Sequence, residues 1–169
     1  TGIVSVAPGT PAGSYAISYK ICEKIAPANC STNTVNVVVT AAPIATTVDN
    51  PASVGGAAGN PSLVNALAND TLNGTAVNIA DVVVSVVTPA SNPGVSLNTS
   101  TGIVSVAPGT PAGTYAITYR ICEALNPANC SNNTVNVVVT AAAIVATADT
   151  PATVSKVLGN ASLINALAN

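Results

Sequence analysis

Apolar and polar residues alternate with a period of two along several short stretches of the chain. Residues 114–123 read TYAITYRICE and residues 134–141 read TVNVVVTA. Such alternation is typical of half-buried β-strands, and Gly, Pro, Asn and Ser separate the stretches as turn residues do. The pattern predicts these strands: 44–49, 62–68, 77–88, 95–98, 102–106, 114–123 and 134–141.

The chain also repeats itself at an interval of 100 residues. Residues 1–10, TGIVSVAPGT, recur letter for letter as residues 101–110, and about 50 of the 69 comparable positions are identical. A period of about 100 residues is too long for a solenoid unit and matches one small β domain. The expected division of the chain is the back part of one repeat, a complete repeat and the front part of the next: 1–42, 43–142 and 143–169.

Neither partial repeat has enough strands to bury both faces of a sandwich. We therefore expect a window from a longer array, or a unit that neighbouring chains complete. Seven short strands per repeat without helical periodicity favour an all-β fold, a series of tandem Ig-like Greek-key β-sandwich repeats. The inward-facing positions of the last two strands would line one core: Tyr115, Ile117, Tyr119, Ile121, Val135, Val137 and Val139.

The composition removes most catalytic chemistry. The 169 residues contain no His, Met, Trp or Phe, and only 6% are charged. Without His there is no usual general base and no usual zinc ligand, so we expect no enzyme and no catalytic residue. Four basic residues and a net charge of −2 cannot neutralise a phosphate backbone, so nucleic acid is not an expected partner. No apolar run reaches the roughly 18 residues of a membrane span, so none is expected in this segment.

Two cysteines recur at the same positions of each copy. Cys22 and Cys30 flank one loop, and Cys122 and Cys130 flank its equivalent. An antiparallel hairpin brings such positions within disulfide reach. A metal site would need more ligands, and a redox pair usually has C-x-x-C spacing. The spacing therefore predicts one disulfide within each hairpin and an oxidising, extracellular location.

A tyrosine follows the motif Pro-Ala-Gly in both copies, as Tyr15 and Tyr115. We interpret both as tyrosine corners, whose hydroxyl bonds to the backbone a few residues upstream. An ordinary core tyrosine is the alternative.

Three stretches carry a family resemblance: GVSLNTSTGIVSVAPGTPAGTYAITYRIC, YRICEALNPANCSNNTVNVVVT and LVNALANDTLNG. They resemble the bacterial Ig-like, or cadherin-like, tandem repeats of giant Bacteroidota cell-surface adhesins, among them the gliding-motility adhesin of flavobacteria. The resemblance covers essentially the whole chain. It implies export, a long filament at the cell surface, and a role in adhesion or surface movement.

The resemblance also suggests two candidate sites, one for a glycan and one for a calcium ion. Asp70-Thr71-Leu72 is similar to the sequence on which Bacteroidota attach O-linked glycans, which would place a glycan on Thr71; a plain turn explains it too. Asp49-Asn50, Asn69-Asp70 and Asp81 offer oxygen ligands of the kind that calcium prefers, and cadherin-like repeats can hold that ion. Asx turns explain these residues equally well. We expect no cofactor, with structural calcium as the open alternative.

The leading functional hypothesis is a structural repeat in the shaft of an extracellular adhesin filament, which extends an adhesive tip from the cell surface for attachment or gliding. One alternative is a pilus-like fibre of short subunits joined by strand complementation. Another is a multivalent glycan-binding repeat. The expected partners are neighbouring repeats of the same protein, with surface polysaccharide or other adhesin chains as further candidates. The sequence does not indicate the adhesive ligand, the number of repeats or the anchor.

Overall fold

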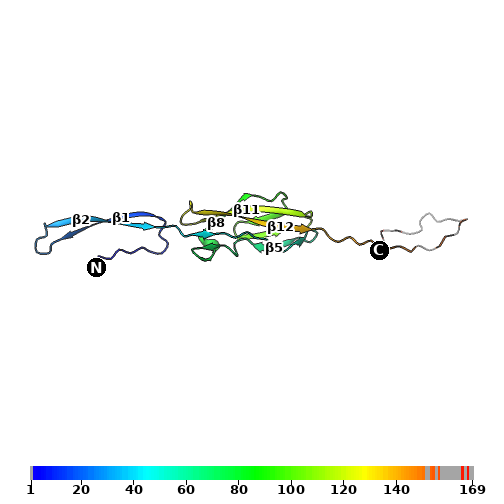
Figure 1. Cartoon of the computed structure of the whole chain (residues 1–169), viewed down its shortest axis with the longest axis horizontal. Coiled ribbons are helices and arrows are strands. Elements are labelled where there is room, and N and C mark those ends of the chain that lie inside the picture. The colour runs from blue at the N-terminus through cyan, green and yellow to red at the C-terminus, as the bar shows by residue number, and fades with distance from the viewer. Residues whose placement is uncertain (1, 151–152, 155, 157–164, 166, 168–169) are drawn as a thin grey trace.

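The computed structural model describes residues 2–150, 153–154, 156, 165 and 167. Its elements are strands with one 3-10 turn (Figure 1). No helix among the described residues is long and apolar enough to span a membrane. In chain order the elements are β1 (Gly13–Cys22), β2 (Cys30–Val39), β3 (Ile44–Ala45), β4 (Val54–Gly55), β5 (Asn60–Asn65), β6 (Thr71–Leu72), β7 (Thr75–Ala76), η1 (Ile79–Asp81), β8 (Val82–Thr88), β9 (Val95–Asn98), β10 (Ile103–Val106), β11 (Gly113–Glu123) and β12 (Cys130–Thr140).

Two sheets enclose the main core. One has the strand order β4-β12-β11-β8 and the other β5-β10-β9, while β3, β6 and β7 form a small third sheet. The alternation in β11 and β12 turns every second side chain inward, as the period of two requires. The all-β sandwich predicted from the sequence is therefore confirmed. Its buried apolar residues are Ala66, Leu67, Val82, Val84, Val95, Val104, Val106, Tyr115, Ile117, Tyr119, Ile121, Val135, Val137 and Val139.

A glycine fixes the turn between β9 and β10. Gly102 has a φ of +74°, and a Cβ placed there would lie 2.7 Å from the Asn65 side-chain oxygen. Only glycine fits both this backbone conformation and this close approach without strain. The hairpin then aligns Val104 with Leu97 of β9 and with Val64 of β5.

The first copy of the repeat forms a hairpin of its own. Strands β1 and β2 pair from Gly13 opposite Val39 to Cys22 opposite Cys30. Strands β11 and β12 pair in the same register, from Gly113 opposite Val139 to Cys122 opposite Cys130. In Figure 1 the β1–β2 hairpin lies beyond one end of the sandwich, and only the second hairpin has a further sheet against it.

Two predicted strands have different bounds because asparagine side chains bond to the nearby backbone. Asn78 accepts a hydrogen bond from the Ala80 amide and starts η1, so the predicted strand 77–88 begins only at Val82. Asn65 accepts one from the Leu67 amide, which ends β5 before residue 68. Such local bonds compete with the sheet ladder.

The predicted strand 44–49 is also shorter in the structure. Only Ile44 and Ala45 pair with β6, and Asp49 makes a single parallel bridge to Val135. Between them, the Thr46 hydroxyl lies 2.9 Å from the Ser131 hydroxyl. The segment is thus held by a side-chain contact at Thr46 and by backbone bonds at Asp49, where a continuous ladder was expected.

The strand count per repeat differs from the seven expected. Residues 44–140, all of which the structure describes, contain ten strands, and four of these, β3, β4, β6 and β7, have only two residues. These short strands carry too few residues to show a period of two. The division at 43 and 142 stays a prediction, and much of the predicted third segment, 143–169, lies outside the described residues.

Candidate functional site

Two acidic side chains and a tyrosine meet inside the sandwich. Tyr119 points inward from the middle of β11. Asp49 is fixed by its backbone, which accepts a hydrogen bond from the Asn136 amide at 2.9 Å. Asp70 lies just before β6, after the turn that ends β5. Tyr119 and Asp70 are 0% exposed and Asp49 is 5% exposed, so the cluster has no opening for a dissolved substrate.

The tyrosine hydroxyl lies at the centre of this cluster. Its oxygen is 2.8 Å from Asp70 Oδ2, 2.8 Å from the Ala66 carbonyl oxygen and 3.5 Å from Asp49 Oδ2. The other Asp70 oxygen accepts the Thr47 amide at 2.9 Å. These bonds join β11 to the segments around Ala66 and Asp70 and to Asp49, whose backbone pairs with β12.

The single hydroxyl hydrogen of Tyr119 faces two acceptors. A tyrosine hydroxyl carries one hydrogen and can donate fully to only one acceptor at a time. Tyr119 is directed as a donor at both Asp70 Oδ2 and the Ala66 carbonyl oxygen, each at 2.8 Å. The cluster therefore has fewer donor hydrogens than acceptors, which favours uptake of a proton by one of its two carboxyl groups.

The pKa shifts have the same direction. Burial raises the pKa of Asp49 to about 6, and the neighbouring Asp70 charge adds to that rise. Burial also raises the pKa of Asp70, while the bonds from Thr47 and Tyr119 oppose the rise. Burial, with Asp70 beside it, raises the pKa of Tyr119, so the hydroxyl keeps its hydrogen. The cluster is thus a proton-dependent part of the core.

The structure brings together two of the three acids considered as calcium ligands. Asp49 and Asp70 are together, but the third candidate, Asp81, is an exposed residue of η1. Among the described residues, no group of three or more His, Cys, Asp or Glu side chains could hold a metal ion. Calcium takes six to eight oxygen ligands. Asp49 and Asp70 accept hydrogen bonds from Tyr119 and Thr47 and supply only part of such a ligand set, so structural calcium stays an open alternative.

The cysteines close the tips of both hairpins. The Sγ atoms of Cys22 and Cys30 are 2.05 Å apart, and those of Cys122 and Cys130 are 2.06 Å apart. Each pair occupies directly opposed positions of its ladder. Oxidation of these cysteines where the protein works stays a prediction.

The two predicted corner tyrosines make the same local bond. The Tyr115 hydroxyl donates to the Pro111 carbonyl at 2.9 Å, and the Tyr15 hydroxyl donates to the Pro11 carbonyl at 2.8 Å. Thr71, the candidate glycan site, lies in β6 between Ala45 and Ala76 and is partly buried. Its modification also stays a prediction.

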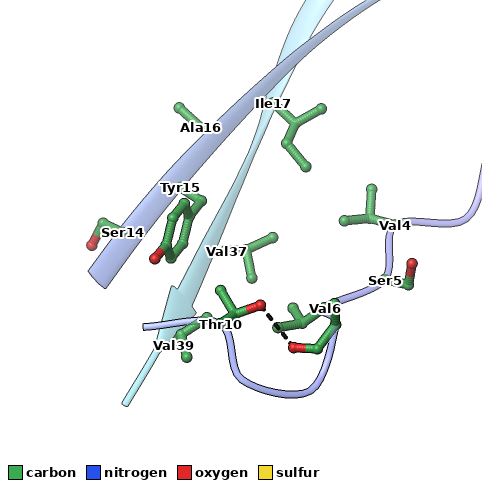
Figure 2. A pocket seen from close by; sticks show the side chains of 11 residues that line it. Val4, Ser5, Val6, Thr10, Ser14, Tyr15, Ala16, Ile17, Val37 and Val39 are labelled. Carbon is green, nitrogen blue, oxygen red and sulfur yellow. Dashed lines mark hydrogen bonds between the residues drawn. The ribbon is translucent and has the colours of Figure 1, made fainter. Parts of the chain in front are cut away.

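The inward-facing side of the first hairpin is open. Tyr19 is 45% exposed, whereas its equivalent Tyr119 is 0% exposed. Figure 2 shows the hollow beside this hairpin, of about 450 Å³, lined by Val4, Val6, Ile17 and Val37 among others. In the second copy the equivalents of these four residues are all buried core positions. The side of β1–β2 that corresponds to the buried side of β11–β12 is therefore exposed to solvent.

Solved structures that resemble the chain are extracellular domains of cadherins. Domains 3–6 of protocadherin gamma B2 match with a TM-score of 0.44 and 14% identity, over 75% of this chain and 33% of that one. Mouse cadherin-23 domains 22–24 match with a TM-score of 0.43 and 14% identity, over 82% of this chain and 45% of that one. Human desmocollin-1 matches with a TM-score of 0.45 and 8% identity, over 65% and 23%. The chain thus spans a third of the protocadherin chain.

No family model and no curated protein sequence matches the chain.

Sequence reasoning placed Tyr119 in the core and Asp70 in a turn, but did not connect them. A signal was present, because Tyr19 and Asp149 repeat Tyr119 and Asp49 while Asn50 becomes Thr150. The aspartate is the same in both copies although the residue after it changes, and Tyr119 carries a hydroxyl group at an inward strand position. Together these two features indicate a buried polar pair.

Proposed function

We propose that the chain is part of the shaft of an extracellular adhesin filament, built from tandem β-sandwich repeats that extend an adhesive tip for attachment or gliding. Each repeat would serve as a spacer, and adhesion would depend on parts of the protein beyond these residues. The repeats themselves would carry no reaction.

The observation that carries this proposal is the difference in burial between two nearly identical hairpins. The inward face of β11–β12 is covered by the sheet of β5, β10 and β9, while the same face of β1–β2 is exposed. Residues 43–98 supply most of that cover in the complete repeat. A preceding repeat with an equivalent segment would cover β1–β2 in the same way, at about 25 cal/mol per Å² of apolar surface removed from water.

The course of the chain also supports a filament. In Figure 1 the chain reaches the sandwich from the β1–β2 hairpin at one end, and after β12 it leaves at the opposite end. Repeats connected in this way add length in series. The hairpin disulfides support the extracellular location, because such bonds persist in oxidising compartments.

The test is the intact mass of the polypeptide purified from cells, with and without reducing agent, combined with antibody labelling of unbroken cells. A mass of hundreds of kilodaltons that survives reduction, with surface labelling, would support the shaft. Labelling only after cell lysis would contradict the extracellular role.

The open hairpin face also favours one second candidate, a fibre of separate subunits joined by strand complementation. A mass near the 16.4 kDa of this chain would support that fibre and rule out the covalent array.

A further inference from the structure

The loop at the tip of the second hairpin reaches back to the first copy of the repeat. This loop, residues 123–129, joins β11 to β12 and is closed by the disulfide between Cys122 and Cys130. We propose that it is a junction latch, a surface that docks each repeat against the end of the preceding copy and fixes the angle between them. The partner is a second copy of this repeat, and the mechanical meaning of the latch rests on the proposed shaft.

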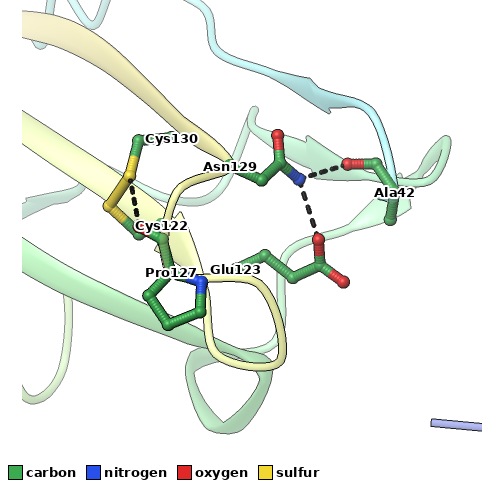
Figure 3. Close-up of a disulfide and its surroundings, with 6 residues drawn as sticks. All are labelled: Ala42, Cys122, Glu123, Pro127, Asn129 and Cys130. Carbon is green, nitrogen blue, oxygen red and sulfur yellow. Dashed lines mark hydrogen bonds between the residues drawn. A yellow bond between two sulfur atoms is a disulfide. The ribbon is translucent and has the colours of Figure 1, made fainter. Parts of the chain in front are cut away.

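Two asparagine side chains make the contact. Asn126 Oδ1 accepts a hydrogen bond from the Ala12 amide at 2.6 Å. Asn129 Nδ2 donates to the Ala42 carbonyl oxygen at 2.6 Å and to Glu123 Oε2 at 2.8 Å (Figure 3). Ala12 precedes β1 and Ala42 follows β2, so the loop holds the first hairpin at both of its chain ends.

The carboxylate of Glu123 orients the side-chain amide of Asn129. Glu123 is buried at the end of β11, and it accepts one hydrogen of the Asn129 amide. The other hydrogen of the same amide is then directed at Ala42. A charged acceptor makes this orienting bond stronger than a bond between neutral groups.

The loop has its shape before it meets a partner. In both copies the backbone amide of the glutamate donates to the backbone carbonyl of the asparagine that ends the loop at 3.0 Å, as Glu23 to Asn29 and as Glu123 to Asn129. Asn29 Nδ2 also donates to Glu23 Oε2, at 2.9 Å. The first copy keeps this arrangement on an exposed loop. Because the latch is already ordered, docking costs little conformational entropy.

The two copies differ at one of the two contact positions. Asn126 corresponds to Ala26, whose side chain has no acceptor, whereas Asn129 is kept as Asn29. Position 126 therefore makes a contact in one copy that the residue of the other copy cannot make. A repeat with Ala at this position would hold its predecessor through one side-chain bond only. The array would then contain tighter and looser junctions, encoded by this residue.

The first experiment measures hydrogen exchange at the Ala12 amide by NMR in the full chain. Asn126→Ala should speed that exchange roughly three- to tenfold, because the amide loses its acceptor. Asn126→Asp keeps an acceptor oxygen and should retain most of the protection. Ala26→Asn adds an asparagine to the other loop and should leave Ala12 unchanged. Equal exchange in Asn126→Ala and the unmodified chain would overturn the latch.

The second experiment separates the junction from the loop. Asn129→Ala removes both the bond to Glu123 and the bond to Ala42, whereas Asn29→Ala removes only the equivalent bond within its own loop. Residual dipolar couplings then report the orientation of the β1–β2 hairpin relative to the sandwich. We expect Asn129→Ala to broaden that orientation and Asn29→Ala to preserve it; equal effects would contradict the proposal. Neither result depends on cell-surface location, so the latch can fail while the shaft stands, and the reverse.

Discussion

The hairpins β1–β2 and β11–β12 have nearly the same sequence, the same register, the same disulfide and the same tyrosine-to-proline bond. They differ in what lies against them. Ile17 is 43% exposed and Ile117 is 1% exposed, although each faces inward at the same ladder position. The hairpin is therefore specified by local sequence, whereas the core is specified by segments far away in the chain. Matched changes in the two copies separate these two contributions.

The largest contrast should come from truncating the equivalent isoleucines. Ile117→Ala removes a fully buried side chain and should lower the free energy of unfolding of the sandwich by about 2–5 kcal/mol. Ile17→Ala removes a half-exposed one and should change it by less than about 0.5 kcal/mol. Urea unfolding followed by the tyrosine signal measures both. Equal losses would mean that the first hairpin already shares the core.

The buried acids give the second contrast, since only the second copy has its tyrosine enclosed by them. The pKa of Asp49 is about 6 in the folded protein and 3.8 as its ordinary value, so between these pH values the folded state binds more protons. The free energy of unfolding should therefore be higher at pH 4 than at pH 8, and fall by up to about 3 kcal/mol as the pH rises through 6.

Asp49→Asn tests that pH dependence, because the amide stays neutral and can donate a hydrogen to the cluster. We expect it to flatten the dependence and to raise stability at pH 8. Asp81→Asn, at an exposed position, serves as the control and should keep the dependence of the unmodified chain. A stability that rises between pH 4 and pH 8 would contradict the neutral-carboxyl interpretation.

The sequence predicted the elements whose side chains alternate over many residues. Strand β11 was expected at 114–123 and spans Gly113–Glu123, because every second residue of it faces the core. The apolar pattern of the sequence did not predict that strands break at Asn65 and Asn78. At each of these positions one hydrogen bond between the side chain and the backbone outweighs the pattern.

The polar cluster could not be assembled from the sequence for a different reason. Tyr119 meets Asp49 and Asp70 across 70 and 49 positions of chain, and no periodicity connects residues at such distances. The same holds for Asn126 and Ala12, which are 114 positions apart. Types of element follow from short-range patterns, whereas the partners of a polar group depend on the tertiary fold.

The disulfides allow a third matched contrast. Replacing both Cys122 and Cys130 by Ser should lower the free energy of unfolding of the sandwich by about 2.5 kcal/mol, the loop-closure value for so short a loop. The same replacement of Cys22 and Cys30 should leave the sandwich nearly unchanged, because that hairpin lies outside the core. Unfolding under non-reducing conditions measures both, and addition of reductant to the unmodified chain should reproduce the first change. A loss of stability on replacing Cys22 and Cys30 as large as that for Cys122 and Cys130 would show that β1–β2 supports the sandwich.

The smallest contrast concerns the corner tyrosines. Tyr115→Phe removes a hydrogen bond of 2.9 Å to the Pro111 carbonyl from a residue only 9% exposed, and should cost the sandwich about 1 kcal/mol. Tyr15→Phe removes the equivalent bond from a residue 39% exposed, where water can replace the lost donor. Its cost to the sandwich should be near zero. If a preceding repeat is fused so that it covers β1–β2, the cost of Tyr15→Phe should rise to that of Tyr115→Phe. A fused protein in which Tyr15→Phe stays silent would mean that the two hairpins, despite their shared sequence, do not acquire the same surroundings.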